Sequence, residues 1–325
     1  MNSPILTSSS RRRFLTNTAV ASAAAYFLPS TLFAQAAAAA TDVPAVVAQG
    51  RAAGAIAKIT TQTLRGNVSV LMGSGGNIAV IPGKQGKLIV DSGYSTSRPQ
   101  ITAALTALSP DAVTHLVNTH WHFDHTDGNE WMHSIGATII AHDNTKTRLS
   151  TPQEITAFQA HFPPSPAGAI PTKTFADKHT IHINGETLHL THYAPAHTDT
   201  DISVHFQNAD ILHTGDTFFN GFYPFIDYSS GGSINGMIAA AERTIAMTTD
   251  KTIIIPGHGA LANKADFVIF HDMLVATRDA VAAQKKQGKS VEETIAAKPN
   301  AAYDAKYGGG FLAPAVYVRL VYQGV

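Results

Sequence analysis

The chain has 325 residues, and 44% of them are hydrophobic, which is enough for the core of one large α/β domain or two small ones. Lys plus Arg and Asp plus Glu both number 23, so the formal net charge is zero and no basic surface predicts a nucleic-acid partner. The absence of cysteine excludes disulfides, thiolate nucleophiles and cysteine-ligated metal sites, whereas histidine, with 16 residues, is unusually frequent.

The N-terminus resembles a twin-arginine signal peptide over residues 1–36. Arg11, Arg12 and Arg13 precede a weakly apolar stretch, and Ala34-Gln35-Ala36 has the small residues of a cleavage site. A membrane anchor is the alternative, but the stretch is short for a spanning helix and contains Pro29. We therefore expect export and cleavage, a periplasmic or secreted location, and no stable membrane insertion afterwards.

Residues 65–325 are predicted to form one folded domain, and residues 37–64 a linker and N-terminal tail in which 43–59 could be a short helix. Strands and helices alternate without a repeat, which favours a single layered α/β domain. The expected strands are 68–72, 77–81, 87–91, 113–117, 138–141, 180–183, 187–191, 202–206, 211–214 and 252–255. The expected helices are 98–108, 128–135, 234–247, 264–287 and 291–297. Residues 151–171 are rich in proline and lack periodicity, which predicts a long loop or lid.

Three histidines and an aspartate lie within six positions, directly after the predicted buried strand at 113–117. They are His120, His122, Asp124 and His125. Imidazole nitrogen and carboxylate oxygen suit a borderline ion such as zinc, and a loop that leaves a strand end can direct several of them at one point. A polar loop with capping and surface histidines would explain one or two of these residues, but not four together.

Three further candidates, His197, Asp216 and His258, each follow the end of a later predicted strand. Each has a simple alternative when taken alone: a turn residue, a cap and a glycine-flanked bend. Their joint occurrence after the first cluster favours one shared metal site at the edge of a sheet.

The motif His120-x-His122-x-Asp124-His125, followed in order by His197, Asp216 and His258, resembles that of the metallo-β-lactamase superfamily over roughly residues 65–265. The resemblance implies a four-layer αββα sandwich and a binuclear metallohydrolase of the glyoxalase II and lactonase-like type. It also implies two zinc ions, with iron or manganese left open. His120, His122 and His197 would bind the first ion; Asp124, His125 and His258 would bind the second; Asp216 would bridge both. Asp91, at a strand end, would support the loop that carries the cluster.

The ligand types suit hydrolysis. Three neutral imidazoles leave the first ion a strong Lewis acid, and two carboxylates make the second site more anionic and better suited to holding water. Two ions about 3.5–4 Å apart share one water and lower its pKa towards neutrality, which gives hydroxide without a protein nucleophile. We expect attack on the acyl carbon of a small-molecule substrate, with Asp124 as a catalytic residue that takes the proton.

The ligand set also narrows the substrate. Lactamases of the commonest zinc type use a cysteine at the position of Asp216, so this chain agrees better with hydrolases of lactones, esters and thioesters, with β-lactams as a side activity. Export weighs against a glutathione thioester, which is mainly cytosolic. A mononuclear iron dioxygenase acting on persulfides is the alternative, because it would use His120, His122 and His197 alone. The oligomeric state is not predicted.

Three further features near these residues carry expectations of their own. Five aromatic residues lie between Phe218 and Phe225, and they could form an apolar wall beside the metals, with Tyr223 as a catalytic hydrogen-bond donor to a developing oxyanion. Core packing is the alternative for two or three of them. The glycine-tipped hairpin at 73–76 could fold over this wall. His192 could contact a ligand from behind.

Overall fold

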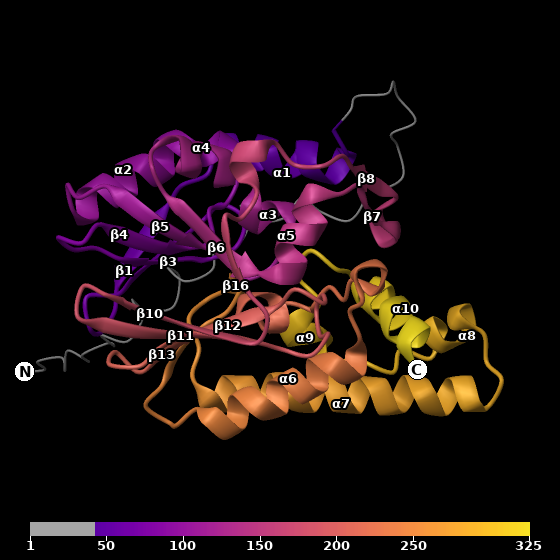
Figure 1. Ribbon diagram of the computed structural model, residues 1–325. Helices are drawn as coiled ribbons and strands as arrows, with labels where there is room; N and C mark the ends of the chain where they lie inside the picture. The colour runs from indigo at the N-terminus through magenta and orange to yellow at the C-terminus, as the bar shows by residue number, and fades with distance from the viewer. Residues whose placement is uncertain (1–42) are drawn as a thin grey trace, which may run out of the picture.

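The computed structural model describes residues 43–325 and shows two β-sheets packed face to face between two groups of helices (Figure 1). The first sheet has seven strands in the order β1-β2-β3-β4-β5-β6-β9, and the second has five in the order β10-β11-β12-β13-β15. The first contains β1 (Thr60–Thr63), β2 (Ser69–Met72), β3 (Ile78–Ile81), β4 (Lys87–Val90), β5 (Val113–Val117), β6 (Thr138–His142) and β9 (Lys173–Phe175). The second contains β10 (Lys178–Ile183), β11 (Glu186–His192), β12 (Ile202–Phe206), β13 (Ile211–His213) and β15 (Ile253–Ile255).

Helices cover the outer face of each sheet. On the side of the first sheet lie α1 (Ala45–Ala55), α2 (Arg98–Leu108), α3 (Phe123–Thr126), α4 (Asn129–Ser134) and α5 (Asp143–Ser150). On the side of the second lie α6 (Ile234–Met247), α7 (Lys264–Lys286), α8 (Val291–Ala296), α9 (Asp304–Tyr307) and α10 (Pro314–Gly324). This is the predicted four-layer αββα sandwich.

The central strands β3 and β4 of the first sheet are buried on both faces, because each face packs against another layer. Leu88 and Val90 of β4 pack into the cluster between the two sheets, whereas Ile89 packs against α2 and α4. Ala79 and Val80 of β3 alternate in the same way. A continuous apolar run therefore marks a strand buried between layers, and this explains why the central strands β3 and β4 were predictable.

The long helix α7 begins and ends as its sequence predicts. Asn263 caps its first turn, and Asp266 returns a hydrogen bond to the Asn263 backbone. Phe267 and Phe270 face the second sheet, where they pack with Ile254 of β15. The helix thus closes the fourth layer.

The N-terminal part of the domain begins earlier than the sequence indicated. Residues 37–64 were expected to be linker and tail, but α1 lies within them and β1 pairs with β2 in the first sheet. β1 has the sequence Thr-Thr-Gln-Thr with all four side chains exposed, so it shows no apolar pattern. Edge strands without a buried face give no periodic signal.

The proline-rich segment 151–171 is more ordered than a loop. It contains a two-stranded antiparallel hairpin of β7 (Gln153–Ile155) and β8 (Ala160–Phe162). Three residues are too few for a strand to show periodicity, which is why this hairpin was missed.

The predicted signal peptide and its cleavage site lie outside the described residues. Within residues 43–325, no helix is long and apolar enough to cross a membrane.

Candidate metal centre

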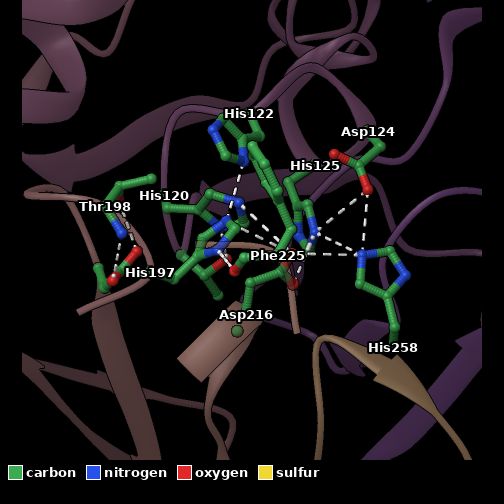
Figure 2. Close-up of polar contacts among 12 residues, drawn as sticks. His120, His122, Asp124, His125, His197, Thr198, Asp216, Phe225 and His258 are labelled. Carbon is green, nitrogen blue, oxygen red and sulfur yellow. Dashed lines mark hydrogen bonds and ion pairs between the residues drawn. The ribbon is translucent and has the colours of Figure 1, made fainter. Parts of the chain in front are cut away.

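All seven predicted ligands lie together at one edge of the sandwich, where strands of both sheets end (Figure 2). His120 and His122 lie in the loop after β5, and Asp124 and His125 lie in α3, which follows directly. The other three come from the second sheet: His197 follows β11, Asp216 follows β13, and His258 opens β16 (His258–Gly259) after β15. Strands that run in one direction end at one edge, so ligands far apart in the sequence converge.

His120, His122 and His197 form the first triad, which consists of imidazoles only. Their facing nitrogens lie within 4.8 Å of one another, and His197 Nε2 is 2.9 Å from His122 Nδ1. All three residues are buried. Three neutral nitrogen donors in a closed pocket are a suitable site for a zinc-like ion.

Asp124, His125 and His258 form the second triad, which contains a carboxylate. Asp124 Oδ2 lies 3.1 Å from His258 Nε2 and 3.6 Å from His125 Nε2, and the two imidazole nitrogens are 3.3 Å apart. The Asp124 side chain is 17% exposed, whereas the side chains of the other six residues are at most 7% exposed. The centre is therefore accessible beside Asp124.

Asp216 lies between the two triads. Its Oδ1 is 3.1 Å from His125 Nε2, and its Oδ2 is 3.4 Å from His258 Nε2. The same Oδ2 is 3.6 Å from His197 Nε2 and 3.9 Å from His120 Nε2. One carboxylate thus reaches both triads, as a bridging ligand must. Gly257 makes room for it, because a Cβ there would come within 1.9 Å of Asp216 Oδ1.

The second nitrogen of four imidazoles is held by a hydrogen-bond acceptor, which sets the tautomer. His125 Nδ1 donates to Asp91 Oδ2 at 2.7 Å, His122 Nε2 to Asp227 Oδ2 at 3.0 Å, and His197 Nδ1 to the Phe225 carbonyl at 2.7 Å. His120 Nδ1 donates to Thr119 Oγ1 at 3.0 Å, because that hydroxyl already donates to Asp91. The other nitrogen of each ring therefore presents a lone pair to the centre.

These donors fit a cation. His120 Nε2 is buried and has no hydrogen-bond partner. His197 Nε2 and His122 Nδ1 face each other without a proton to share, which is unfavourable unless a cation accepts both lone pairs. Two nitrogens bound at about 2.0–2.1 Å to one tetrahedral ion would be roughly 3.3 Å apart, close to the spacing seen here.

The two triads differ in charge. Burial lowers the pKa of His120 well below its ordinary value, and burial together with the neighbouring His122 lowers the pKa of His197 to about 4. Burial opposes protonation of His258 too, but the Asp216 and Asp124 carboxylates outweigh it and raise its pKa to about 9. His120 and His197 of the first triad are therefore neutral near pH 7, and the second triad carries the compensating charges of an anionic site.

Asp91 supports the ligand loop as the resemblance implied. Its Oδ1 accepts from the Thr119 backbone at 2.8 Å. Its Oδ2 accepts from His125 Nδ1 and from the Thr119 hydroxyl, which in turn accepts from His120 Nδ1. Asp91 has a φ of 65°, a conformation that a non-glycine residue adopts only when its surroundings require it. One carboxylate thus orients an imidazole in each triad.

The glycine-tipped hairpin is not a lid. Gly76 donates from its backbone to the Asp124 carbonyl, and a Cβ at Gly76 would lie 2.1 Å from His125 Cε1. The Asn77 side chain donates to the carbonyls of Pro256 and Gly259. The hairpin therefore packs beneath the ligands, and its glycines permit close approach rather than motion.

The aromatic segment divides between the site and the core. Phe219 stacks on His258 with ring centroids 5.2 Å apart, and the Phe225 ring lies 6.0 Å from that of His197. The Tyr223 hydroxyl, in contrast, donates to Asp304 Oδ1 and the Asn300 carbonyl, and its ring is 1% exposed. The prediction of Tyr223 as an oxyanion donor is therefore wrong, because its only donor is used in the core.

The expectation for His192 is also not met. Its Nε2 bonds to the Asp199 carbonyl at 3.1 Å, and its ring stacks on His142 with centroids 3.7 Å apart. The residue that does support a ligand from behind is Asp227, which sequence reasoning missed. Asp227 caps a turn by accepting from Ser229 and Ser230, so in the sequence it reads only as a capping residue.

Curated sequence relatives of the chain include hydroxyacylglutathione hydrolases. The chain is 28% identical over 160 residues to a hydroxyacylglutathione hydrolase from Polaromonas sp., an alignment that covers 48% of this chain and 52% of that protein. The chain thus spans about half the length of the curated relatives that it matches.

Solved structures share the fold. A metallo-β-lactamase from Pontibacter korlensis matches with a TM-score of 0.54 and 17% identity, over 67% of this chain and 99% of that one. A stereoselective inverting sec-alkylsulfatase from Pseudomonas sp. matches with a TM-score of 0.61 and 14% identity, over 92% of this chain and 54% of that one. Residues 71–258, more than half of the chain, match the family model of the metallo-β-lactamase superfamily and include all seven residues of the centre. The chain belongs to the metallo-β-lactamase superfamily.

Proposed function

We propose that the protein is an exported dizinc hydrolase that cleaves a carbonyl–heteroatom bond in a small molecule: a lactone, ester, thioester or β-lactam. The observation that carries this proposal is the convergence of two triads on one bridging carboxylate, Asp216. A mononuclear site would need only the first triad. The second is equally complete, which favours two ions.

Each group of residues would have a separate task. The triads and Asp216 would hold two zinc ions, which when bound would polarise the substrate carbonyl and activate a shared water. Asp124, the partly exposed ligand, would accept a proton from that water. Phe219 and Phe225, packed on His258 and His197, would exclude bulk water from the centre.

A metal count and a substrate screen test the activity. Zinc-loaded protein should contain two ions per chain and hydrolyse at least one lactone, aryl ester, thioester or β-lactam. Asp124→Ala should remove turnover and the second ion but keep the first, whereas Asp250→Ala, an exposed carboxylate outside the centre, should change neither.

Two results would contradict the proposal. Full turnover by Asp124→Ala with both ions bound would reject the role of Asp124. Oxygen uptake on a persulfide by iron-loaded protein, with no hydrolysis in the screen, would favour the dioxygenase alternative. A secondary alkyl sulfate belongs in the screen because an alkylsulfatase shares the fold, and cleavage of that compound alone would replace the carbonyl substrate.

Export through a twin-arginine signal is part of the proposal and rests on the sequence of residues 1–36. A reporter fused after residue 40 should be exported, and replacing Arg11, Arg12 and Arg13 with lysine should abolish export. Export that does not depend on these arginines would reject this localisation.

A further inference from the structure

A buried carboxylate, Asp201, lies outside the seven ligands and is not used in the proposed reaction. It is 2% exposed, and both of its oxygens accept hydrogen bonds from one residue, Thr198. The Thr198 hydroxyl donates to Oδ1 at 2.6 Å, and the Thr198 backbone N–H donates to Oδ2 at 2.8 Å. Thr198 directly follows the ligand His197 and lies beside the first triad (Figure 2). Asp201 therefore closes the turn that carries His197.

The charge of Asp201 is costly in this position. Burial raises the pKa of Asp201 to about 7, although the two hydrogen bonds from Thr198 act in the opposite direction. Asparagine would avoid the charge, but it would present its own N–H groups to one of the two Thr198 donors. Only a carboxylate of this size accepts at both positions, which explains why the turn contains one.

A chain of hydrogen bonds continues from Asp201 to the loop that carries His120 and His122. Thr200 Oγ1 lies 2.8 Å from Thr198 Oγ1, and the Trp121 backbone N–H donates to Thr200 Oγ1 at 3.2 Å. Because a backbone N–H can only donate, the Thr200 hydroxyl gives its proton to Thr198, and the Thr198 hydroxyl gives its proton to Asp201. The direction of each bond is thus fixed, and the chain ends on a group that accepts.

The same turn contacts the peptide on both sides of His120. Trp121, the residue after His120, donates to Thr200, which is 79 residues away in the sequence. Thr119, the residue before His120, accepts at its carbonyl from the Ile202 backbone N–H at 2.9 Å. These contacts set the position of the His197 turn relative to the loop of His120 and His122.

We propose that Asp201 is a positioning residue of the first triad, because the hydrogen-bond chain that ends on it holds the His197 turn against the loop of His120 and His122. The three imidazoles are then at ligand spacing before an ion binds, so binding requires less ordering. The inference rests on the part of the proposed function that places an ion in the first triad. It makes the hydroxyl of Thr198, and not its methyl group, the important part of that side chain.

Two replacements of Thr198 separate the hydroxyl from the shape. Thr198→Val keeps the size and removes the hydroxyl, and it should lower the zinc affinity of the first site about 10–100-fold, as is typical for loss of a contact that orients a ligand. Thr198→Ser keeps the hydroxyl, and its zinc affinity should stay within about threefold of wild type. If Thr198 only packed against its neighbours, the order of the two variants would be reversed.

Chelator competition measures the zinc affinity of both sites, and cobalt substitution shows which site has changed. The second site should stay within twofold of wild type, which also shows that each variant is folded. Thr277→Val is the matched control. Thr277 lies on α7, is buried, and its hydroxyl has no hydrogen-bond partner among the described residues, so the same substitution there should change neither site.

Asp201→Asn tests the end of the chain. It should weaken the first site by a factor similar to that of Thr198→Val. The double variant should lose less affinity than the product of the two single losses, because both changes break one chain. If Thr198→Val does not fold, Thr200→Val breaks the chain at the Trp121 contact and allows the same measurement.

Unchanged first-site affinity, equal loss at both sites, or single losses that multiply in the double variant would overturn the inference. The wild type tests the proposed function separately. If it binds zinc and the variants weaken only the first site, but no compound in the screen is hydrolysed, the proposed function fails and the inference is supported. If the wild type hydrolyses a substrate and the variants bind zinc as it does, the inference fails and the proposed function is supported.

Discussion

The two triads use similar side chains in different surroundings. The first is buried, consists of imidazoles only, and His120 and His197 have lowered pKa values. The second includes a carboxylate, raises the pKa of His258 to about 9, and is exposed at Asp124. The difference fits the proposed division of tasks, because a neutral closed site would keep a bound ion strongly electrophilic, whereas an anionic open site would hold water and receive protons.

Removing the shared carboxylate should have the largest effect. Asp216 is within 3.9 Å of imidazole nitrogens from both triads, so Asp216→Ala should reduce bound metal at both sites and abolish measurable turnover. Metal analysis after dialysis, with circular dichroism to confirm folding, measures this. A variant that keeps one ion per chain would show that Asp216 serves a single triad.

Changes within one triad should separate the sites. His197→Ala should weaken the first site and His258→Ala the second, so each variant should bind one tight ion. Cobalt substitution distinguishes them, since the two sites differ in ligands and hence in absorption spectrum. Identical spectra from the two variants would contradict a division between the triads.

A smaller and selective effect is expected at Asp227. Asp227→Asn removes the charge that orients His122, and loss of such a contact typically lowers metal affinity about 10–100-fold. Chelator competition should show this loss at the first site and an unchanged second site. Ser229→Ala is the matched control, because it removes another partner of Asp227 but leaves the contact with His122. Equal weakening of both sites would mean that Asp227 acts only on the fold.

The smallest effect is expected at Tyr223, which the structure places outside both triads. Tyr223→Phe should lower the free energy of unfolding by about 1–2 kcal/mol, because the Asp304 carboxylate and Asn300 carbonyl lose a donor. Metal content and kcat/KM should stay within twofold. Loss of an oxyanion donor would instead lower kcat about 10²–10³-fold, so denaturant unfolding and kinetics together decide between the roles.

The first-layer residues of the centre were predictable because their pattern is local. Four of the candidate ligands lie within six positions of the sequence, and the other three follow strands whose apolar runs mark them as buried. The residues that accept hydrogen bonds from these imidazoles were harder to predict. Asp91 was expected from the resemblance, but nothing near Asp227 indicates that it lies 3.0 Å from His122, 105 residues away in the chain.

The wrong expectations have the same origin. Tyr223 lies in a segment whose neighbours Phe219 and Phe225 do pack on candidate metal ligands, and only the tertiary structure shows that its hydroxyl points to Asp304 instead. His192 is close to His197 in sequence, yet the strand directs its ring to His142. The glycines at 73–76 could mean flexibility or close packing, and the contact of Gly76 with His125 decides for packing.

The sequence alone determined which central strands are buried, where α7 begins and ends, and which seven residues are metal-ligand candidates. It could do so because periodicity, capping and ligand chemistry are properties of neighbouring residues. The tertiary structure decided which acceptor holds each imidazole and where the centre is exposed. These features depend on contacts between distant segments, and such contacts exist only after the two sheets have packed together.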